Sequence, residues 1–207
     1  MRYGEGHKDE TRSRVLRAAS AAVRARGPDG VSVAEVMAQA GLTHGGFYTH
    51  FDSKDALVVA AIEDAFAQGR RRFGRQAQGL APAAALAAFV EAYLSREHRD
   101  HPARGCPVSA LAGDMARQPA AARAAFDAGV DGMLNGLSRW LPDAEPAARR
   151  ALAASLLAEM AGAVALSRAV SDDRLADEIL SACRTRVRVR AGLSEPAERT
   201  AELSGSG

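Results

Sequence analysis

Residues 31–57 constrain the fold more than any other part of the chain. Their sequence, VSVAEVMAQAGLTHGGFYTHFDSKDAL, contains two short helical patterns separated only by a glycine turn at Gly41. The first begins at Ser32, which forms a capping box with the glutamate three residues later. The second begins at the N-cap candidate Thr43 and covers about residues 44–50. Two short helices around a tight turn predict a helix-turn-helix, whose second helix lies in a DNA major groove.

Helical patterns on both sides of this segment would complete a small core. Residues 9–26 carry apolar side chains at helical spacing and end at a Gly-Pro-Asp-Gly stretch, which stops a helix. Residues 1–8 are expected to be loose. Near the end of the segment, the pair Asp52-Ser53 offers caps for a helix that should run to about Arg75. Phe47 and Phe51 are four residues apart, so we expect them in the core of this domain rather than between DNA bases.

The rest of the chain also shows helical patterns and no strand-like alternation. Alanine and leucine dominate a composition that is 47% hydrophobic and only 5% aromatic, which favours helices. The polar residues 192–207 are expected to be disordered. Beyond a boundary at residues 79–82, we expect helices near residues 83–99, 107–117, 119–140, 145–170 and 172–190.

The charges of the chain are nearly balanced. With 27 basic and 25 acidic residues the net charge is +2, so any contact with nucleic acid must come from local placement of charge. A basic cluster lies late in the helix that follows the segment. We expect it to be a solvated helix end rather than a DNA contact, because that part should point away from the groove. Its residues are Arg70, Arg71, Arg72 and Arg75.

Cysteine content and apolar runs exclude several other classes of protein. The two cysteines, Cys106 and Cys183, are too few and too far apart for a disulfide framework or a zinc finger. No apolar stretch follows the N-terminal charges, so a secretory signal is not expected. The long uncharged run at residues 76–90 is too short to span a bilayer. We expect a soluble cytoplasmic, nucleoid-associated protein with no membrane contact, no metal and no cofactor.

A dispersed set of residues between positions 11 and 57 matches a known pattern. The set comprises Thr11-Arg12, Leu16-Arg17-Ala18-Ala19, Gly30, Ser32-Val33, Val36, Ala40-Gly41, Thr43, Phe47-Tyr48, His50-Phe51, Ser53-Lys54 and Leu57. In these residues the chain resembles the N-terminal domain of the TetR/AcrR family of transcriptional regulators. The resemblance is close over residues 9 to about 60, and beyond them only the length and helical character match.

The resemblance implies an all-α protein of two domains. Residues 9–56 would be an N-terminal three-helix helix-turn-helix DNA-binding domain, with a connecting helix over residues 53–75. Residues 76–191 would be a C-terminal helical domain for ligand binding and dimerisation. Such a protein binds a palindromic double-stranded DNA operator as a homodimer, because two copies double the contacts and set the half-site spacing.

The resemblance also assigns DNA contacts to the turn and the second helix. The DNA-binding residues would be Ser32, Thr43, His44, Gly45, Gly46, Tyr48, Thr49, His50 and Lys54. Tyr48, His50 and Lys54 would contact phosphates, while the caps Ser32 and Thr43 could do so in addition. Residues 44–46 would face the bases. Two of these three are glycines, so close backbone approach and readout of DNA shape both stay open.

The C-terminal helices would supply the dimer surface and a ligand pocket. The last two helices of each subunit would form a four-helix bundle, although some of their apolar residues must serve the subunit's own core. The expected dimer residues are Leu152, Leu156, Met160, Val164, Leu175, Ile179 and Cys183. The pocket candidates, whose alternative role is ordinary core, are Phe89, Tyr93, Cys106, Leu111, Met115, Phe126, Met133 and Trp140.

Cys106 has the sequence context of a reactive thiol. It is expected at a helix start beside Arg104, and both features lower a thiol's pKa. Two interpretations stay open: an inert, partly buried cysteine, and a sensor of electrophiles or oxidants, as in some regulators of this family. A metal site formed with His98 and His101 fits no standard zinc spacing.

These features predict a ligand-responsive transcriptional regulator. We expect a repressor that an unknown small-molecule or electrophilic effector releases by changing the separation of the two recognition helices. One alternative is a regulator that senses through Cys106. A small helical enzyme with Cys106 as nucleophile lacks a visible acid/base set, so we expect no enzyme activity. A helical scaffold that has lost DNA binding is the remaining alternative, because of the two glycines.

Overall fold

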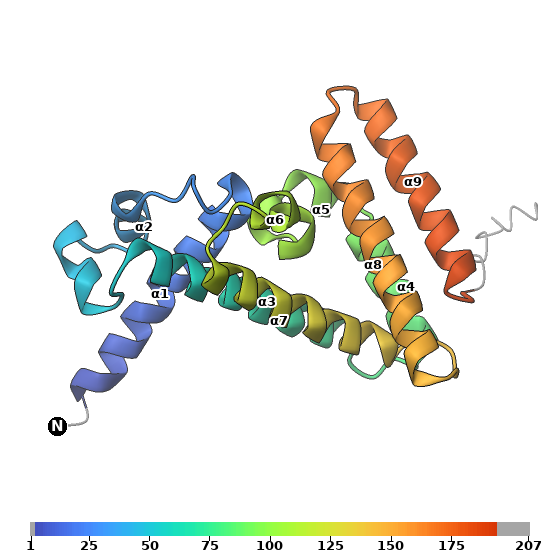
Figure 1. Cartoon of the computed structure of the whole chain (residues 1–207), viewed down its shortest axis with the longest axis horizontal. Helices are drawn as coiled ribbons and strands as arrows, with labels where there is room; N and C mark the ends of the chain where they lie inside the picture. Colours follow the sequence, from blue (N-terminus) through green and yellow to red (C-terminus); the bar gives the residue numbers. More distant parts are fainter. Residues whose placement is uncertain (1–2, 194–207) are drawn as a thin grey trace, which may run out of the picture.

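The computed structural model describes residues 3–193, with side chains from Asp9 onward (Figure 1). It consists of helices joined by short turns, and no strand occurs within that range. The all-α prediction is therefore confirmed. The expected disorder of residues 192–207 falls almost entirely on positions outside the described residues.

Four helices form the N-terminal part of the chain. They are α1 (Tyr3–Arg26), α2 (Val33–Gln39), the 3-10 helix η1 (His44–Thr49) and α3 (Lys54–Ala77). The expectation that residues 1–8 are loose is wrong from Tyr3 onward, where α1 begins. The buried positions of α1 start only at Thr11 and Val15, so the apolar pattern does not indicate the polar first part of this helix. A helix that has already formed extends easily into such a polar part.

The remaining elements form the C-terminal part. They are α4 (Pro82–Tyr93), α5 (Arg96–Asp100), the 3-10 turn η2 (Pro102–Arg104), α6 (Pro107–Met115), α7 (Ala120–Ser138), α8 (Pro146–Ala169) and α9 (Asp173–Arg190). The single helix expected over residues 83–99 is instead two. Ser95 causes the break, because its hydroxyl accepts a hydrogen bond from the amide of His98 and caps a new helix.

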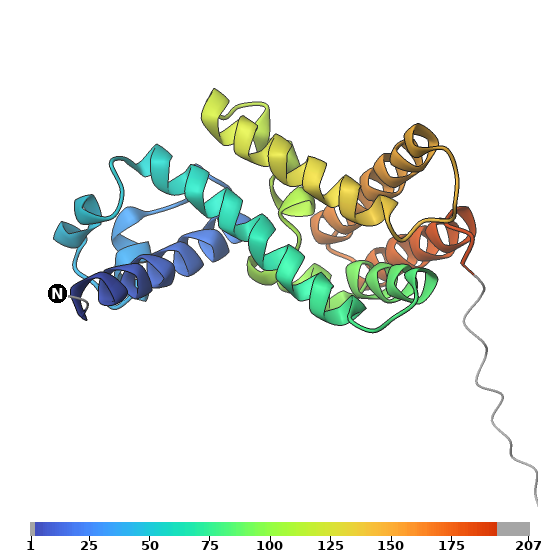
Figure 2. The same cartoon turned by 90° about the horizontal axis from the view of Figure 1, so that it is seen from below.

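Helix α3 joins the two parts of the protein. It packs against α1 near its beginning and lies beside α7 over much of its length (Figures 1 and 2). Most of its buried residues belong to one continuous apolar core that extends from Val15 in α1 to Ala191 after α9. The N-terminal and C-terminal helices are therefore joined through closely packed side chains.

A glycine lets α7 approach α3 closely. A Cβ atom added to Gly129 would lie 2.2 Å from Cδ2 of Phe66, a distance that packed atoms do not adopt. The buried Phe66 ring thus fills the space left by the missing side chain, and Phe126 meets the same ring edge-on at a centroid distance of 5.6 Å. This contact fixes the spacing of the two helices next to the cavity described below.

Helices α8 and α9 form an antiparallel pair at the end of the molecule that lies away from α2 and η1 (Figure 1). Among the described residues, α8 alone is long and apolar enough to cross a membrane by composition. Of its most apolar part, 44% is buried inside the protein, so a single helix of this kind is weak evidence for a membrane span.

Candidate nucleic-acid interface and effector cavity

The helix-turn-helix geometry follows from local sequence signals. The Ser32 hydroxyl accepts a hydrogen bond from the Glu35 amide and starts α2. Gly41 has a φ of +72°, which glycine adopts without strain, and it turns the chain from α2 into η1. The second half of the expected capping box does not form, because the carboxylate of Glu35 pairs with Arg26 at 2.6 Å. This ion pair connects α2 to α1.

The second helix of this motif is η1, a 3-10 helix rather than the expected α-helix. Thr43 occupies its N-cap position, but its side chain makes no capping bond in the structure, which corrects that expectation. The Phe47 side chain is only 2% exposed and anchors η1 to the core, stacked on Phe51 at a centroid distance of 5.9 Å. The prediction that both phenylalanines are core residues is confirmed.

The outer side of η1 presents polar groups to solvent. Tyr48 is 70% exposed although its ring touches Phe47 edge-on at 5.1 Å. Thr43, His44, Gly45, Thr49 and Lys54 are also exposed. A Cβ atom added to Gly45 would meet nothing within 4 Å, so the backbone there is open to a partner.

Three of the expected DNA-binding residues are less exposed to solvent than these. Ser32 and His50 are half-buried, and His50 Nδ1 has no hydrogen-bond partner among the described residues. Gly46 faces Met37, whose Cε would lie 3.6 Å from an added Cβ, so this glycine contributes to packing. The Lys54 ammonium donates to the Asp29 carbonyl at 3.3 Å, which places it beside the turn between α1 and α2.

A cavity of about 180 Å³ lies between α3, α4, the start of α6 and α7. Four of the eight expected pocket residues line it: Phe89, Cys106, Met133 and Trp140. The other four do not. Leu111 and Met115 are buried in the core, Phe126 packs on Phe66, and Tyr93 packs edge-on against His98 at 4.7 Å.

The α3 side of this cavity was not predicted from the sequence. Phe66, Arg70 and Phe73 line it, because α3 extends beyond the DNA-binding part into the C-terminal helices. Arg70 is therefore more than a solvated helix end. Helix-interior glycines at Gly132 and Gly136 also line the cavity, and their regular spacing was a usable signal.

A buried histidine connects the end of α4 to the start of α6. His98 Nδ1 lies 2.6 Å from the Tyr93 carbonyl, and His98 Nε2 accepts from the Cys106 amide at 2.8 Å. These partners require a neutral ring with its hydrogen on Nδ1. Burial is the main cause that lowers the pKa of His98 from 6.5 to about 4. The charges of Arg168 and Arg72 act in the same direction, and the hydrogen bond to the Tyr93 carbonyl opposes them.

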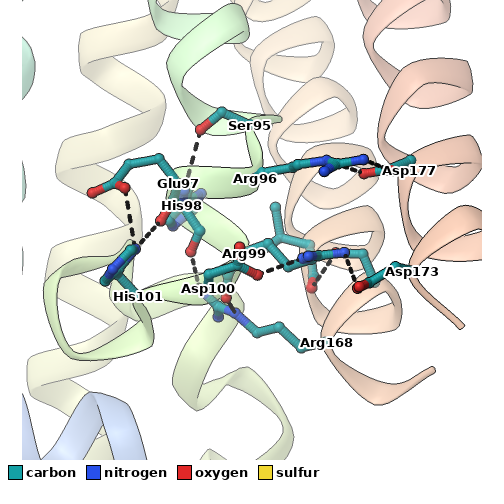
Figure 3. Close-up of polar contacts among 12 residues, drawn as sticks. Ser95, Arg96, Glu97, His98, Arg99, Asp100, His101, Arg168, Asp173 and Asp177 are labelled. Atoms are coloured by element: carbon teal, nitrogen blue, oxygen red, sulfur yellow. Dashed lines mark hydrogen bonds and ion pairs between the residues drawn. The ribbon is translucent and has the colours of Figure 1, made fainter. Parts of the chain in front are cut away.

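Arginine side chains hold the short α5 segment in place (Figure 3). Arg168 of α8 donates to the carbonyls of His98 and Arg99, at 2.7 and 3.0 Å. Arg96 and Arg99 also pair with carboxylates of α9, those of Asp177 and Asp173. Carbonyls at the end of a helix have no helical partner, so Arg168 satisfies groups that would otherwise be unpaired.

Cys106 does not have the activated thiol that its sequence context suggested. It is the N-cap residue of α6, but it is only 2% exposed, and burial raises the pKa of its thiol. Its Sγ atom lies 3.7 Å from the Met133 sulfur. No group of three or more histidine, cysteine or acidic side chains converges on a metal-sized site in the part of the chain that the structure describes.

Most of the expected dimer residues are committed to the protomer's own core. Leu156, Met160, Val164 and Cys183 are buried there, Leu152 and Ile179 are half-buried, and only Leu175 is exposed, at 43%. The opposite faces of the same helices carry exposed small and apolar residues. These are Ala158, Gly162, Ala165 and Leu166 on α8, with Leu175, Ala182 and Val189 on α9.

Two family models match the chain. Residues 15–61 match the model of the tetR family of bacterial regulatory proteins. Residues 82–180 match the C-terminal domain of LmrA/YxaF-like transcriptional regulators. No curated protein matches the sequence.

Several solved structures share the fold. The reduced form of E. coli NemR is 22% identical with a TM-score of 0.73, and the match covers 91% of this chain and 99% of that one. A TetR transcriptional regulator from Chloroflexus aurantiacus J-10-FL is 26% identical with a TM-score of 0.72, over 88% and 94% of the two chains. FadR from Bacillus subtilis in complex with stearoyl-CoA is 12% identical with a TM-score of 0.64, over 88% and 99%.

Proposed function

The chain belongs to the TetR family of bacterial regulatory proteins and is a DNA-binding transcriptional regulator, and on that premise we propose that it is a repressor released by a small molecule. It would act as a cytoplasmic homodimer on a palindromic operator. One observation carries this proposal: the exposed polar surface of η1 and an internal cavity share a single apolar core through α3. No catalytic step is part of this function.

The phosphate contacts would come from the rim of the η1 surface. Tyr48 offers a phenol hydroxyl on an exposed ring. Thr43, without a capping bond, keeps its hydroxyl for the DNA. Because Gly45 has no side chain, the operator sequence would be recognised mainly through backbone approach and DNA shape at this position.

Replacing Tyr48 or Lys54 with alanine should weaken binding to the DNA flanking the protein's own gene by about tenfold each. Lys54→Ala should also reduce the slope of affinity against salt by about one, because one fewer counterion is released. Fluorescence anisotropy at several salt concentrations measures both effects. Arg75→Ala, an exposed change at the opposite end of α3 from Lys54, is the matched control. Unchanged affinity in both variants would show that the phosphate assignment is wrong.

The dimer would form through the exposed faces of α8 and α9. Small residues such as Ala158 and Gly162 permit close helix approach, and Leu166, Leu175 and Val189 supply apolar area. Two such helix pairs form a four-helix bundle, which fixes the distance between the two η1 helices. A palindrome has a fixed half-site spacing, so small changes in this distance would lower operator affinity.

A structural change at the cavity would be transmitted to the DNA-binding part through the turn η2. Cys106 lines the cavity two residues after η2, and Arg24 of α1 donates to the Ala103 carbonyl of η2 at 2.9 Å. The same guanidinium donates to Gln68 of α3 at 2.9 Å. An effector that displaces the start of α6 would therefore move α1 and, with it, the helix-turn-helix.

Sensing through Cys106 is the second candidate function, favoured by the position of this residue on the cavity wall. A structural neighbour is described as the reduced form of NemR, but at 22% identity that likeness supports only the fold. Since burial raises the pKa of the Cys106 thiol, the thiol would be protonated in the resting protein. It would become reactive only when the cavity opens.

Cys106 should accordingly react slowly with N-ethylmaleimide at neutral pH. We expect a rate more than about tenfold below that of free cysteine, because the thiolate is the reacting species. Peptide mass spectrometry over time measures the rate at Cys106 separately from that at Cys183. The same protein in urea is the control, since unfolding exposes the thiol. A native rate equal to that in urea would contradict the buried, protonated state.

A further inference from the structure

Four aromatic side chains line the cavity. Phe66 and Phe73 lie on the α3 side, Phe89 on α4, and Trp140 follows the end of α7. Phe89 meets Phe73 edge-on at a centroid distance of 4.6 Å and Trp140 with tilted rings at 5.8 Å. Aromatic walls of this kind offer faces and edges to another ring system.

Glycines hold this cavity open. A Cβ atom added to Gly74 or Gly136 would meet nothing within 4 Å, and one added to Gly132 would only reach Arg70 Nη1 at 4.0 Å. Glycine inside a helix destabilises it by about 1 kcal/mol relative to alanine. Unlike Gly129, these glycines do not serve close helix packing. Their effect is to leave unfilled space between α3 and α7.

The charged side chains at the cavity have only one sign. Arg70 and Arg139 line it and are solvent-exposed, so they stand at its rim. Neither guanidinium has an ion-pair or hydrogen-bond partner among the described side chains. No aspartate or glutamate lines the cavity. These two unpaired positive charges would repel a bound cation, whereas they would attract an anion and pair with it.

We propose that this cavity binds a small planar aromatic carboxylate, with its rings between the phenylalanine and tryptophan side chains and its carboxylate at Arg70 and Arg139. The inference rests on the proposed function, in which this cavity is the effector site. A volume of about 180 Å³ lies below the usual range for drug-sized ligands, about 300–1,000 Å³. The ligand therefore has one or two rings rather than a long or polycyclic body.

Three probes of the same shape and different charge test the proposal. They are 2-naphthoate, the neutral 2-naphthamide and the cationic 2-naphthylmethylammonium. Calorimetry on the full-length protein without DNA should give an affinity for naphthoate at least about tenfold above that for the amide. The cation should not bind. Equal affinities, binding of the cation, or no binding of naphthoate up to about 1 mM would overturn the proposal.

Variants separate the charge from the shape of the cavity. Arg70→Gln and Arg139→Gln should each lower naphthoate affinity by about tenfold and leave naphthamide affinity unchanged. Arg123→Gln, an exposed arginine of α7 outside the cavity, is the matched control. Gly136→Leu should abolish binding of both probes without loss of thermal stability, because leucine favours the helix and fills empty space. Gly113→Leu, at an exposed glycine of α6, should leave binding unchanged.

Release from DNA is measured separately. If naphthoate binds as expected but leaves operator affinity unchanged, the ligand class stands and the proposed ligand-induced release fails. If a cation or an uncharged lipid releases the operator while naphthoate does not bind, the proposed function stands and the ligand class is wrong.

Discussion

Replacing Phe47 with alanine is expected to lower the free energy of unfolding by about 3–5 kcal/mol and to abolish operator binding. The ring is almost fully buried and is stacked on Phe51. It is also the only buried residue of η1, a short 3-10 helix that has little stability of its own. Without this anchor the surface that carries Tyr48 loses its position. Urea unfolding and DNA-binding titrations measure the two losses.

Tyr48→Ala is the matched control, because it removes the neighbouring aromatic ring from the exposed side of the same helix. We expect it to change the free energy of unfolding by less than about 0.5 kcal/mol, as for other surface positions, while weakening DNA binding. Equal destabilisation by the two changes would show that η1 is not anchored through Phe47. Retained operator affinity in a folded Phe47→Ala protein would show that η1 does not form the DNA-binding surface.

Acidification should destabilise the protein through His98. Its pKa is about 4 in the folded protein against 6.5 ordinarily, so below pH 6.5 the unfolded chain takes up the proton more readily. The loss of stability caused by this proton uptake is absent well above pH 6.5 and grows as the pH falls towards 4. It amounts to about 2 kcal/mol at pH 5. A protonated ring would carry a hydrogen on Nε2 and could not accept from the Cys106 amide.

The His98→Gln variant isolates this effect, because all other titrating groups are shared with the wild-type protein. Urea unfolding from pH 8 to pH 5 should show the wild type losing about 2 kcal/mol more than the variant. Glutamine differs from histidine in the placement of its donor and acceptor atoms, so the comparison concerns the slopes and not the absolute stabilities. Parallel pH profiles would mean that His98 is not held in its neutral form.

The DNA-binding half of the molecule was predictable because its signals are local. Ser32, Gly41 and Ser53 act within three residues along the chain, through a side-chain cap or a backbone angle. The spacing of Phe47 and Phe51 likewise places both on one side of a single helical turn. Even here the sequence did not distinguish a 3-10 helix from an α-helix, since the two differ only in hydrogen-bond register.

The cavity was only half predictable. Phe89, Met133 and Trp140 are apolar residues of the expected ligand domain, and they do line it. Phe66, Arg70 and Phe73 lie in a helix that begins in the DNA-binding part, so nothing local assigns them to the cavity. The same limit applies to Cys106, whose position beside a helix start suggested a low pKa. Packing around the thiol raises it instead.

The sequence by itself determined the helical class, the helix-turn-helix and the family, because caps, glycine turns and apolar spacing act between near neighbours in the chain. Only the tertiary structure decided which faces of α8 and α9 are exposed, how long α3 extends beside α7, and which charges stand at the cavity rim. Burial and electrostatic environment depend on segments that are distant in sequence. They arise only when those segments pack together.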